Sequence, residues 1–577
     1  METQSQTAIK EKGTKAIRIT GAEALVKSLQ KEGTKTLFGY PGGAIMPVYD
    51  ALYSVKDELH HVLVRHEQGA IHAAQGFARV TGEVGVAIVT SGPGATNAVT
   101  GIADAMIDST PMVVISGQVT SSLLGTDAFQ ETDVVGVTQP ITKWNYQVKK
   151  AEDIPYAIAR AFYIARSGRP GPVLIDITKD AQFASFDYIY EPVTYIRSYK
   201  PLPNVDPEQI KAAAQLINLS KKPLALIGQG VILGNAEKEL LAFLEKSGIP
   251  AAWTLLGLSA LPSDHPQNVG MLGMHGNYGP NIKTNEADLI IAIGMRFDDR
   301  VTGDLKSYAT NARIIHMEID DAEINKIVHA DVPVLGNVKD SLPMLTKTIS
   351  TNKHESWLQE FRACDRIEYD RIINEEVAPS KPGLTMGEVV HKVSNAFNND
   401  AIMVTDVGQH QMMGCRYFKF KQSRSVVTSG GLGTMGFGLP AAMGAKVGAP
   451  DRPVCLFVGD GGFQMTIQEL GTIFQTKIPV KIVLLNNNFL GMVRQWQELF
   501  FDSRYASTEL INPDFQTIAK GYHIESIKVS ERNNLDEAIQ KMVNHKGAFL
   551  LEVVVEKEGN VFPMVPAGAS VSDIRLE

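Results

Sequence analysis

The chain has few cysteines and no cluster of charge of one sign. Its 577 residues contain three cysteines, Cys364, Cys415 and Cys455. They are odd in number, far apart and without the spacing of metal ligands, which excludes a disulfide framework and a cysteine-based zinc site. No run is rich in Lys and Arg, and the formal net charge is −8. Nucleic acid is therefore not an expected partner.

Long apolar segments are also missing. No stretch of about 18 apolar residues is present to cross a bilayer, and the first twenty residues contain no apolar core of a signal peptide. We therefore expect a cytoplasmic protein that does not contact a membrane. Hydrophobic residues make up 44% of the chain and charged residues 20%, which is typical of globular proteins.

Apolar strands and helical segments alternate along the whole chain. Short runs of Val, Ile and Leu end in Gly, Asp or Asn, as in "VAIVTSGPGATN" and "CLFVGDGGFQ", and longer amphipathic segments follow them. This pattern predicts an α/β fold with parallel sheets covered by helices on both faces. The similarity of these two runs indicates two similar ligand-binding domains. Polar and Pro-rich stretches divide the chain into a flexible N-terminal tail (1–17), a first domain (18–190), a linker (191–204), a central domain (205–350), a second linker (351–383) and a last domain (384–577).

The most specific motif lies in the last third. An apolar strand ends at "GDG" (459–461), an amphipathic helix is expected next, and a second apolar strand ends at "NN" (486–487). Because neighbouring parallel strands have adjacent carboxyl ends, Asp460 and Asn487 are expected to converge at one crevice. Their oxygen atoms suit Mg²⁺. Gly461 and Gly462 let the backbone approach a diphosphate at the next helix N-terminus.

A second glycine-rich segment allows a different interpretation. "GGLGTMGFG" contains G-x-G-x-x-G at Gly431, Gly433 and Gly436, the pattern of a nicotinamide-binding turn. The strand before it is only "SVVTS". A nicotinamide-dependent dehydrogenase built on this segment would give Asp460 and Asn487 no role.

The GDG motif, the 24 residues that follow it (462–485) and the NN pair resemble the thiamine diphosphate motif. From about residue 18 to the C-terminus the chain is similar to the catalytic subunits of the acetohydroxyacid synthase (acetolactate synthase) family. The similarity is carried by "FGYPGGAI", "RHEQGA", "TSGPGATN", "GTDAFQE", "GRPGPVLIDITKD", "RFDDRVTG", "GQHQMM", "GGLGTMGFGLPAA", "GMVRQWQE" and "VFPMVPAG". It implies three doubly wound parallel-sheet domains, which bind the cofactor pyrimidine, FAD and the diphosphate respectively.

The resemblance also implies the cofactor contacts. Mg²⁺ is expected at Asp460, Asn487 and the backbone carbonyl of Phe489. Thiamine diphosphate is expected at Glu67, Val407, Gly408, Gln409, His410, Gly433, Met435, Gly459, Gly461 and Gly462. FAD is expected at Arg169, Gly228, Gly230, Thr254, Met274, His275, Arg296, Asp299, Glu318 and Asn337, and it would be mainly structural. Asn337 stands where the family usually has Asp, and Gln229 where it often has a third glycine.

Glu67 lies in "RHEQGA", at the end of an apolar run and the start of a helical stretch. A purely structural role is possible, since an acid is favoured at a helix N-terminus and Arg65 or His66 could neutralise it. In the resembling family this Glu is the acid bonded to the pyrimidine ring, which enables the cofactor's own amino group to remove a proton. The diphosphate would then be held by the last domain of a neighbouring subunit, so the active unit is expected to be a homodimer or tetramer with shared sites.

The implied reaction decarboxylates pyruvate and transfers the hydroxyethyl carbanion to a second 2-oxo acid. Pyruvate gives 2-acetolactate and 2-oxobutyrate gives 2-aceto-2-hydroxybutyrate, for branched-chain amino acid synthesis. Arg300 is the candidate for the acceptor carboxylate, and Trp496 for the wall that favours an ethyl group. The remaining catalytic candidates are Gly43, Phe129, Gln130 and Lys179. In the structural alternative, Arg300 pairs with Asp298 or Asp299, and Trp496 belongs to the core.

Other functions remain open at this stage. A catabolic acetolactate synthase makes the same product without FAD, although "RFDDR" and "GTDAFQE" argue against it. A pyruvate oxidase would reduce an electron acceptor and consume no second 2-oxo acid. An inactive regulatory paralogue should have lost Glu67 or the metal ligands. A separate regulatory small subunit is a possible partner.

Overall fold

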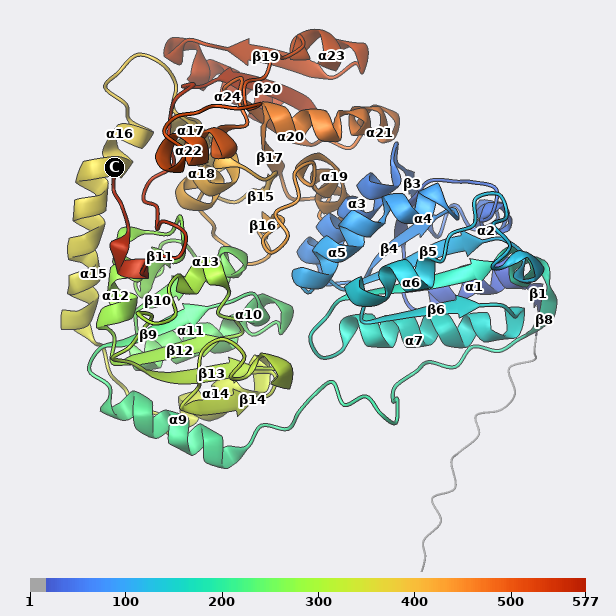
Figure 1. Ribbon diagram of the computed structural model, residues 1–577, viewed down its shortest axis with the longest axis horizontal. Helices are drawn as coiled ribbons and strands as arrows, with labels where there is room; N and C mark the ends of the chain where they lie inside the picture. The colour runs from blue at the N-terminus through green and yellow to red at the C-terminus, as the bar shows by residue number, and fades with distance from the viewer. Residues whose placement is uncertain (1–16) are drawn as a thin grey trace, which may run out of the picture.

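The computed structural model describes residues 17–577, which form three six-stranded parallel sheets and one two-stranded antiparallel sheet. Helices cover both faces of each large sheet (Figure 1). The predicted α/β class with three parallel-sheet domains is confirmed. The expected tail at residues 1–16 lies outside the described residues. Ile17, which we also expected in the tail, instead begins strand β1 (Ile17–Thr20), because it pairs with Tyr188 of β8 (Ser185–Tyr188).

The N-terminal domain is the blue and cyan part of Figure 1. Its sheet has the order β3-β2-β4-β5-β7-β6. The strands are β2 (Thr36–Gly39), β3 (His60–Leu63), β4 (Gly85–Val89), β5 (Met112–Gln118), β6 (Trp144–Val148) and β7 (Pro172–Thr178). The helices are α1 (Gly21–Lys31), α2 (Met46–Tyr53), α3 (Glu67–Thr81), α4 (Pro93–Asn97), α5 (Val99–Ile107), α6 (Val134–Thr138), α7 (Ile154–Arg166) and α8 (Lys179–Phe183).

Alternation along β5 explains why this sheet needs two layers of helices. Val113 and Ile115 enter the hydrophobic cluster on one face, and Met112 and Val114 enter the cluster on the other. Successive side chains of a strand point to opposite faces, so an apolar run such as "MVVIS" must be covered on both.

The central domain, green in Figure 1, has the strand order β11-β10-β9-β12-β13-β14. The strands are β9 (Pro223–Ile227), β10 (Ala251–Trp253), β11 (Asn268–Met271), β12 (Leu289–Ile293), β13 (Arg313–Glu318) and β14 (Val332–Leu335). The helices are α9 (Pro207–Leu219), α10 (Gly230–Leu233), α11 (Glu237–Ser247), α12 (Tyr278–Glu286), α13 (Asp299–Thr302), α14 (Val338–Thr348), α15 (Glu355–Glu368) and α16 (Asn374–Val377). This is the order of a dinucleotide-binding sheet, whose ligand crevice lies at the carboxyl ends of β9 and β12.

The C-terminal domain has the order β16-β15-β17-β18-β20-β19. The strands are β15 (Ile402–Thr405), β16 (Val426–Val427), β17 (Val454–Gly459), β18 (Lys481–Asn486), β19 (Glu525–Val529) and β20 (Phe549–Val554). The helices are α17 (Met386–Ala396), α18 (Gln409–Tyr417), α19 (Gly438–Gly448), α20 (Asp460–Met465), α21 (Leu470–Thr476), α22 (Gly491–Phe500), α23 (Phe515–Gly521) and α24 (Leu535–Asn544). Numbered within each domain, this order equals that of the N-terminal sheet, which explains the similar runs in the sequence.

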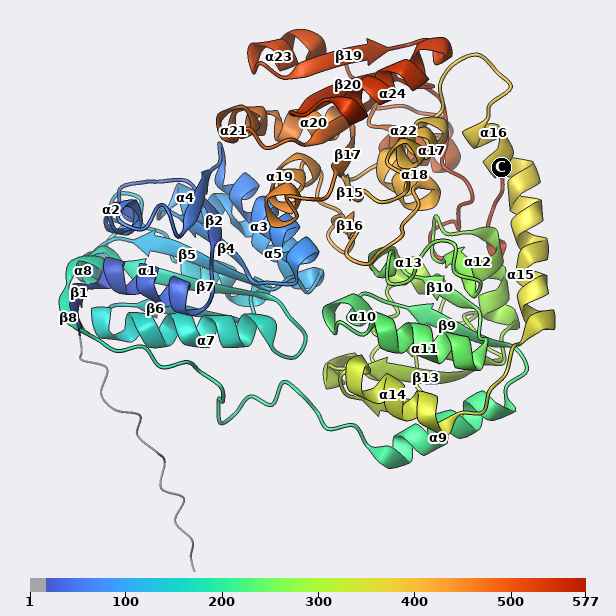
Figure 2. The same ribbon diagram turned by 180° about the vertical axis from the view of Figure 1, so that it is seen from behind.

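The segments between domains have different structures. From β8 to α9 the chain crosses beneath the molecule as an extended connection (Figures 1 and 2). The expected second linker contains α15, whose Trp357 and Phe361 are buried in the central domain. The C-terminal residues also return to this domain, where Val571 is buried and the N–H of Val565 donates to the carbonyl of Met274 at 2.8 Å.

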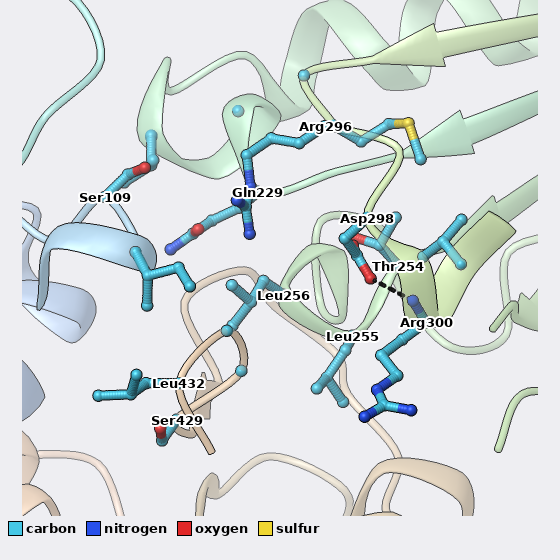
Figure 3. Close-up of a pocket in the computed structure, with 18 of the residues that line it drawn as sticks. Ser109, Gln229, Thr254, Leu255, Leu256, Arg296, Asp298, Arg300, Ser429 and Leu432 are labelled. Atoms are coloured by element: carbon cyan, nitrogen blue, oxygen red, sulfur yellow. Dashed lines mark hydrogen bonds between the residues drawn. The ribbon is translucent and has the colours of Figure 1, made fainter. Parts of the chain in front are cut away.

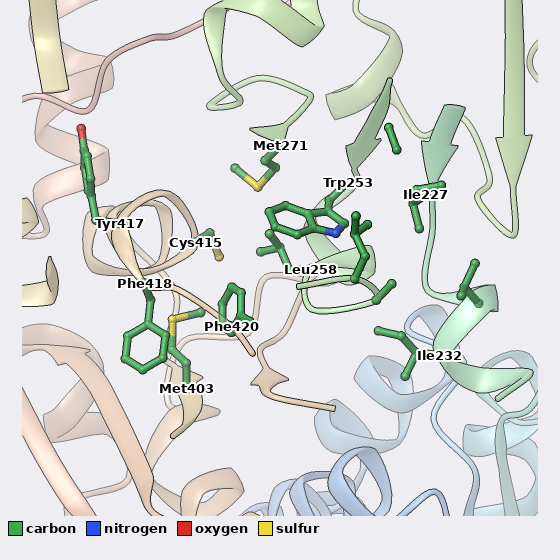
Figure 4. Packing of buried hydrophobic residues seen from close by; sticks show 14 of the residues in the cluster. Ile227, Ile232, Trp253, Leu258, Met271, Met403, Cys415, Tyr417, Phe418 and Phe420 are labelled. Atoms are coloured by element: carbon green, nitrogen blue, oxygen red, sulfur yellow. The ribbon is translucent and has the colours of Figure 1, made fainter. Parts of the chain in front are cut away.

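The central and C-terminal domains share one hydrophobic core. Trp253 and Met271 of the central domain lie in the same cluster as Met403, Phe418 and Phe420 of the C-terminal domain (Figure 4). A continuous core of this kind holds the two domains in a fixed relation.

Candidate functional site

A cavity of about 940 Å³ lies where the three domains meet (Figure 3). The structure brings many of the predicted site residues to its walls. They are Arg169, Gly230, Thr254, Met274, His275, Arg296, Asp299, Glu318 and Asn337 from the FAD set, Val407, Gly408, Gly433 and Met435 from the thiamine diphosphate set, and Arg300 and Trp496 from the substrate set. The cavity is large enough for a sizeable ligand, and its lining comes from sequence segments more than 300 residues apart.

The GDG and NN motifs meet at one edge of the C-terminal sheet. β17 and β18 are parallel neighbours, with Gly459 opposite Leu485. The carboxylate of Asp460 accepts the N–H of Asn488, which adjoins Asn487, and a hydrogen bond from Asn512 at 2.6 Å. Burial raises the pKa of Asp460 to about 6. Asn512 also donates to the side-chain oxygens of Asn486 and Asn488, at 3.1 and 3.0 Å, so the ends of the two strands lie side by side. That Asp460 and Asn487 bind one metal ion stays a prediction.

Our prediction of a single amphipathic helix after GDG is wrong. The segment forms α20, a 3₁₀ turn (Ile467–Glu469) and α21. The break occurs at Thr466, whose φ of −134° is not helical and whose hydroxyl donates to the carbonyl of Gly436 at 3.0 Å. This contact ties the segment to the glycine-rich loop.

The glycine-rich segment does not present a free helix N-terminus. The N–H groups of Gly436 and Gly438 donate to the carboxylate of Asp406, at 3.1 and 2.8 Å. This buried acid occupies the position in which a dinucleotide-binding turn would hold a pyrophosphate. Burial raises the pKa of Asp406 to about 6. The arrangement argues against the nicotinamide interpretation.

Two residues of the "VGQHQ" segment lie behind the cavity wall. The ring of His410 is buried, and a Cβ added at Gly408 or Gly459 would come within 2.9 Å of it. Its Nε2 has no hydrogen-bond partner among residues 17–577. Burial lowers the pKa of His410 to about 3, so the ring is neutral. Gln409 donates to Gln495 at 3.0 Å and to the carbonyl of Gly559 at 2.9 Å.

The catalytic candidates of the N-terminal domain do not line the cavity in the single chain. Glu67 begins α3, is half-buried and accepts a hydrogen bond from Asn97 at 3.0 Å. Its carboxylate lies 3.3 Å from a Cβ added at Gly94. Arg65 points elsewhere, to Gln475 at 2.6 Å and to the carbonyl of Gly471 at 3.0 Å. The proposed neutralisation of Glu67 by Arg65 is therefore wrong.

The other candidates of this domain lie at the carboxyl ends of its strands, with Gly43 after β2, Gln130 beside the loop after β4 and Lys179 directly after β7. The carbonyl of Gln130 lies 2.7 Å from a Cβ added at Gly92 in the loop after β4. Lys179 begins α8, and Gln182 of the same helix donates to the carbonyl of Ala44 at 2.8 Å, next to Gly43. No atom of residues 17–577 lies within 4 Å of a Cβ added at Gly43. Phe129 is 88% exposed. This face of the domain is open in the single chain.

The candidates for the flavin site differ in their surroundings. Arg169 forms ion pairs with Glu323 at 2.7 Å and Asp320 at 3.3 Å. Gly228 lies outside the cavity lining, and a Cβ there would stand 2.0 Å from the carbonyl oxygen of Gly294. Its lack of a side chain is required by packing. Burial raises the pKa of Glu318 to about 7.

Arg300 and Trp496 face the cavity from two domains. The guanidinium of Arg300 is 3.7 Å from the carboxylate of Asp299, and both side chains are more than half exposed. Such a long, exposed pair contributes little, so Arg300 remains available for a ligand. The contact to Asp298 uses the backbone N–H of Arg300 and caps α13 (Figure 3). Trp496 lies against Phe500 with ring centroids 5.2 Å apart, and it is outside the buried core.

Comparison with known proteins identifies the family. Residues 19–137, 210–345 and 406–553 match the N-terminal TPP binding, central and C-terminal TPP binding domains of the thiamine pyrophosphate enzymes. The acetolactate synthase large subunit of Corynebacterium glutamicum is 47% identical over 97% of this chain and 90% of its own length. The chain belongs to the acetolactate synthase large-subunit family.

Other members of this family show the same degree of similarity. The acetolactate synthase isozyme 2 large subunit of Escherichia coli is 45% identical over 96% of this chain and 99% of its own. The probable acetolactate synthase large subunit of Methanocaldococcus jannaschii is 44% identical over 96% and 95%. The predicted family, its thiamine-dependent enzyme class and thiamine diphosphate as its cofactor are confirmed.

The residues fit the cofactors of such an acetolactate synthase. The Nε2 of His410 has no hydrogen-bond partner among residues 17–577, and Gly408 and Gly459 lie against its ring without side chains. This arrangement suits a diphosphate. One carboxylate, one amide and one backbone carbonyl suit Mg²⁺. Among residues 17–577, no group of three or more His, Cys, Asp and Glu side chains is arranged to hold a metal ion. The expected ligand set contains only one such side chain, that of Asp460. Between residues 17 and 577, no helix is long and apolar enough to span a membrane.

Sequence reasoning missed several residues of this site. Asp406 could have been noticed as an acid that directly follows an apolar strand. Ser109 and Leu256 line the cavity (Figure 3), yet they belong to no motif. Only the packing of three domains brings them together.

Proposed function

We propose that this chain is the catalytic subunit of an acetolactate synthase of branched-chain amino acid synthesis. It would decarboxylate pyruvate and join the remaining two-carbon unit to a second 2-oxo acid, either pyruvate or 2-oxobutyrate. The observation that carries this proposal is one cavity whose lining contains Arg300 and Trp496 together with Val407, Gly433 and Met435. A cation suited to a carboxylate would then share this cavity with the loops that we propose for thiamine diphosphate.

The roles of the side chains follow from their chemistry. Thiamine diphosphate supplies a carbon acid that becomes nucleophilic when it loses a proton. Glu67 would hold a proton for the pyrimidine ring, and Gly43, Phe129, Gln130 and Lys179 would border the reacting centre. Arg300 would bind the carboxylate of the acceptor through its fork of N–H donors. Trp496 would bound the space for the methyl or ethyl group of the acceptor.

Mg²⁺ and FAD are further parts of this proposal. Asp460, Asn487 and the carbonyl of Phe489 would bind the metal, and Gly459, Gly461, Gly462 and His410 would surround the diphosphate. The flavin would lie along the crevice at Gly230, Thr254, Arg296 and Glu318, with Arg169, Met274, His275, Asp299 and Asn337 around it. Gly228 would contribute by packing alone.

We also infer a homodimer or a tetramer with shared active sites. The cluster of Glu67, Gly43 and Gln130 does not line the cavity of its own chain, and Phe129 beside it is 88% exposed. A second subunit would cover this face and bring the two halves together. Because the relatives are named large subunits, we also infer a separate regulatory small subunit. The location would be cytoplasmic.

The test is an assay of the purified chain with pyruvate, Mg²⁺ and thiamine diphosphate, with and without FAD and 2-oxobutyrate. We expect acetolactate to form, and a yellow protein or a requirement for added FAD. Activity without FAD in a colourless protein would favour the catabolic acetolactate synthase. Reduction of an added electron acceptor with no second 2-oxo acid consumed would favour a pyruvate oxidase. Glu67→Gln should lose most turnover and still bind the cofactor.

A further inference from the structure

The glycine-rich loop at residues 429–436 is held by acids of the N-terminal domain of its own chain. At one end of the loop, Asp108 accepts the N–H of Gly430 at 2.9 Å and of Gly431 at 2.7 Å. Asp108 directly follows α5, is fully buried and pairs with Arg79 at 2.7 Å. Both backbone donors thus have a charged acceptor that belongs to another domain.

The second acid, Asp104, fixes the middle of the same loop. Its carboxylate accepts hydrogen bonds from the hydroxyls of Ser429 and of Thr434, the latter at 2.9 Å. The hydroxyl of Ser429 in turn accepts the N–H of Thr434 at 2.8 Å. Gly433 lies between these anchors with φ of +68°, a conformation that side-chain-bearing residues rarely adopt. One buried carboxylate, that of Asp104, therefore holds Ser429 and Thr434 together and fixes the loop between them.

Arg79 connects Asp108 to both ends of the segment. It donates to the carbonyl of Thr428 at 2.7 Å, just before the loop, and its guanidinium lies 5.6 Å from the ring centroid of Phe437, just after it. Its helix, α3, packs against α19 in direct backbone contact, since a Cβ at Gly76 would stand 2.0 Å from the carbonyl oxygen of Ala441. Arg79 cannot shift independently of this helix pair.

We propose that Asp104 and Asp108, the latter oriented by Arg79, are positioning residues that set the conformation of loop 429–436. This rests on the proposed function in one respect, that Gly433 and Met435 of this loop face the bound cofactor. The N-terminal domain then has two tasks. It supplies Glu67 at the first residue of α3, and near the last turn of the same helix it fixes a cofactor loop of its own chain. Glu67 and Arg79 are 12 residues apart on α3, which is about 18 Å at 1.5 Å per residue.

Three variants test this. Asp108→Asn removes the charge that pairs with Arg79 and one acceptor for the two glycine N–H groups. Thr434→Val removes only the hydroxyl bonded to Asp104, and Thr434→Ser restores it. The matched control is Asp288→Asn, because Asp288 also accepts two backbone N–H groups, those of Lys221 and Lys222, far from the loop.

Hydrogen exchange of the peptide 426–437 and the steady-state constants are the readouts. We expect faster exchange in this peptide for Asp108→Asn and Thr434→Val. We also expect a fall in kcat on the order of 10- to 100-fold, because small misplacements of bound groups slow chemistry. Thr434→Ser should recover most of the activity. Asp288→Asn should leave exchange of the loop unchanged, even if it lowers the melting temperature.

The outcomes separate this proposal from the proposed function. If wild-type protein makes no acetolactate, the function is wrong, and loop exchange with calorimetric binding of thiamine diphosphate still tests the loop. If Asp108→Asn does not fold, the Thr434 pair gives the result. Wild-type exchange in peptide 426–437 and unchanged kcat in Thr434→Val, or a loss that Thr434→Ser does not reverse, would overturn the proposal.

Discussion

Replacing Glu368 with alanine should destabilise the junction between the central and C-terminal domains. Its carboxylate pairs with Arg416, and both side chains are 1% exposed. Glu368 also accepts the N–H of Tyr278 at 2.6 Å and a hydrogen bond from Asn277 at 3.0 Å. Arg416 donates to the carbonyl of Gly276 at 3.0 Å, so the ion pair braces the loop that follows Met274 and His275 at the cavity.

The magnitude follows from what the substitution leaves behind. Removing one partner of a buried pair costs about 3 to 5 kcal/mol, because the other charge stays buried without compensation. Two donors that lose their acceptor add at least about 1 kcal/mol. We therefore expect Glu368→Ala to lower the free energy of unfolding by at least about 4 kcal/mol. Replacing both Glu368 and Arg416 with methionine should cost less, since no charge is then stranded.

The assay is urea unfolding followed by circular dichroism and by tryptophan fluorescence, because a chain of several domains need not unfold in one step. The control is Glu360→Ala. Glu360 pairs with Lys222 and Lys283 at 3.1 Å, but it is 38% exposed, so its loss should cost at most about 1 kcal/mol. If Glu368→Ala costs no more than this control, the reasoning about the buried pair is refuted.

Three further changes have defined outcomes. Burial raises the pKa of Glu376 to about 7 from its usual 4.5, so the folded protein is most stable with this carboxyl protonated. The stability from this group is fully present below pH 4.5 and is lost as pH rises through 7. The free energy of unfolding of Glu376→Gln should therefore rise by about 3 kcal/mol relative to wild type between pH 4.5 and 8, and a difference in urea unfolding that stays constant with pH would contradict this. Gly444→Ala would place a Cβ 1.7 Å from the carbonyl oxygen of Ala73 and should cost about 1 to 3 kcal/mol by thermal unfolding, whereas Gly521→Ala meets nothing within 4 Å among the described residues and should cost less than about 0.5 kcal/mol. Trp496→Leu should change the preference for 2-oxobutyrate over pyruvate by at least about tenfold in competition assays, and an unchanged product ratio would exclude Trp496 from acceptor selection.

Much of this fold could be predicted from the sequence because its strands are short apolar runs that end in Gly, Asp or Asn. The neighbouring positions of Asp460 and Asn487 follow from one rule about parallel strands. The break at Thr466 could not be predicted, since it depends on a hydrogen bond to Gly436, thirty residues earlier in the chain.

The network around the cofactor loop was also out of reach of the sequence. Asp104 and Asp108 look like ordinary surface acids at the end of a helix. Their burial appears only when the C-terminal domain packs against α5, more than 300 residues away. Conversely, the motif of Glu67 was readable from the sequence, whereas its half-buried position in the single chain was not.

The most direct test of shared active sites is complementation between two inactive variants. Glu67→Gln and Asp460→Asn are each expected to be inactive as pure proteins. If each site takes Glu67 from one subunit and Asp460 from the other, co-expression should restore about one quarter of wild-type activity, because half of randomly paired dimers are mixed and each has one intact site. No recovery in a mixed dimer that still forms and binds thiamine diphosphate would show that both residues act within one chain.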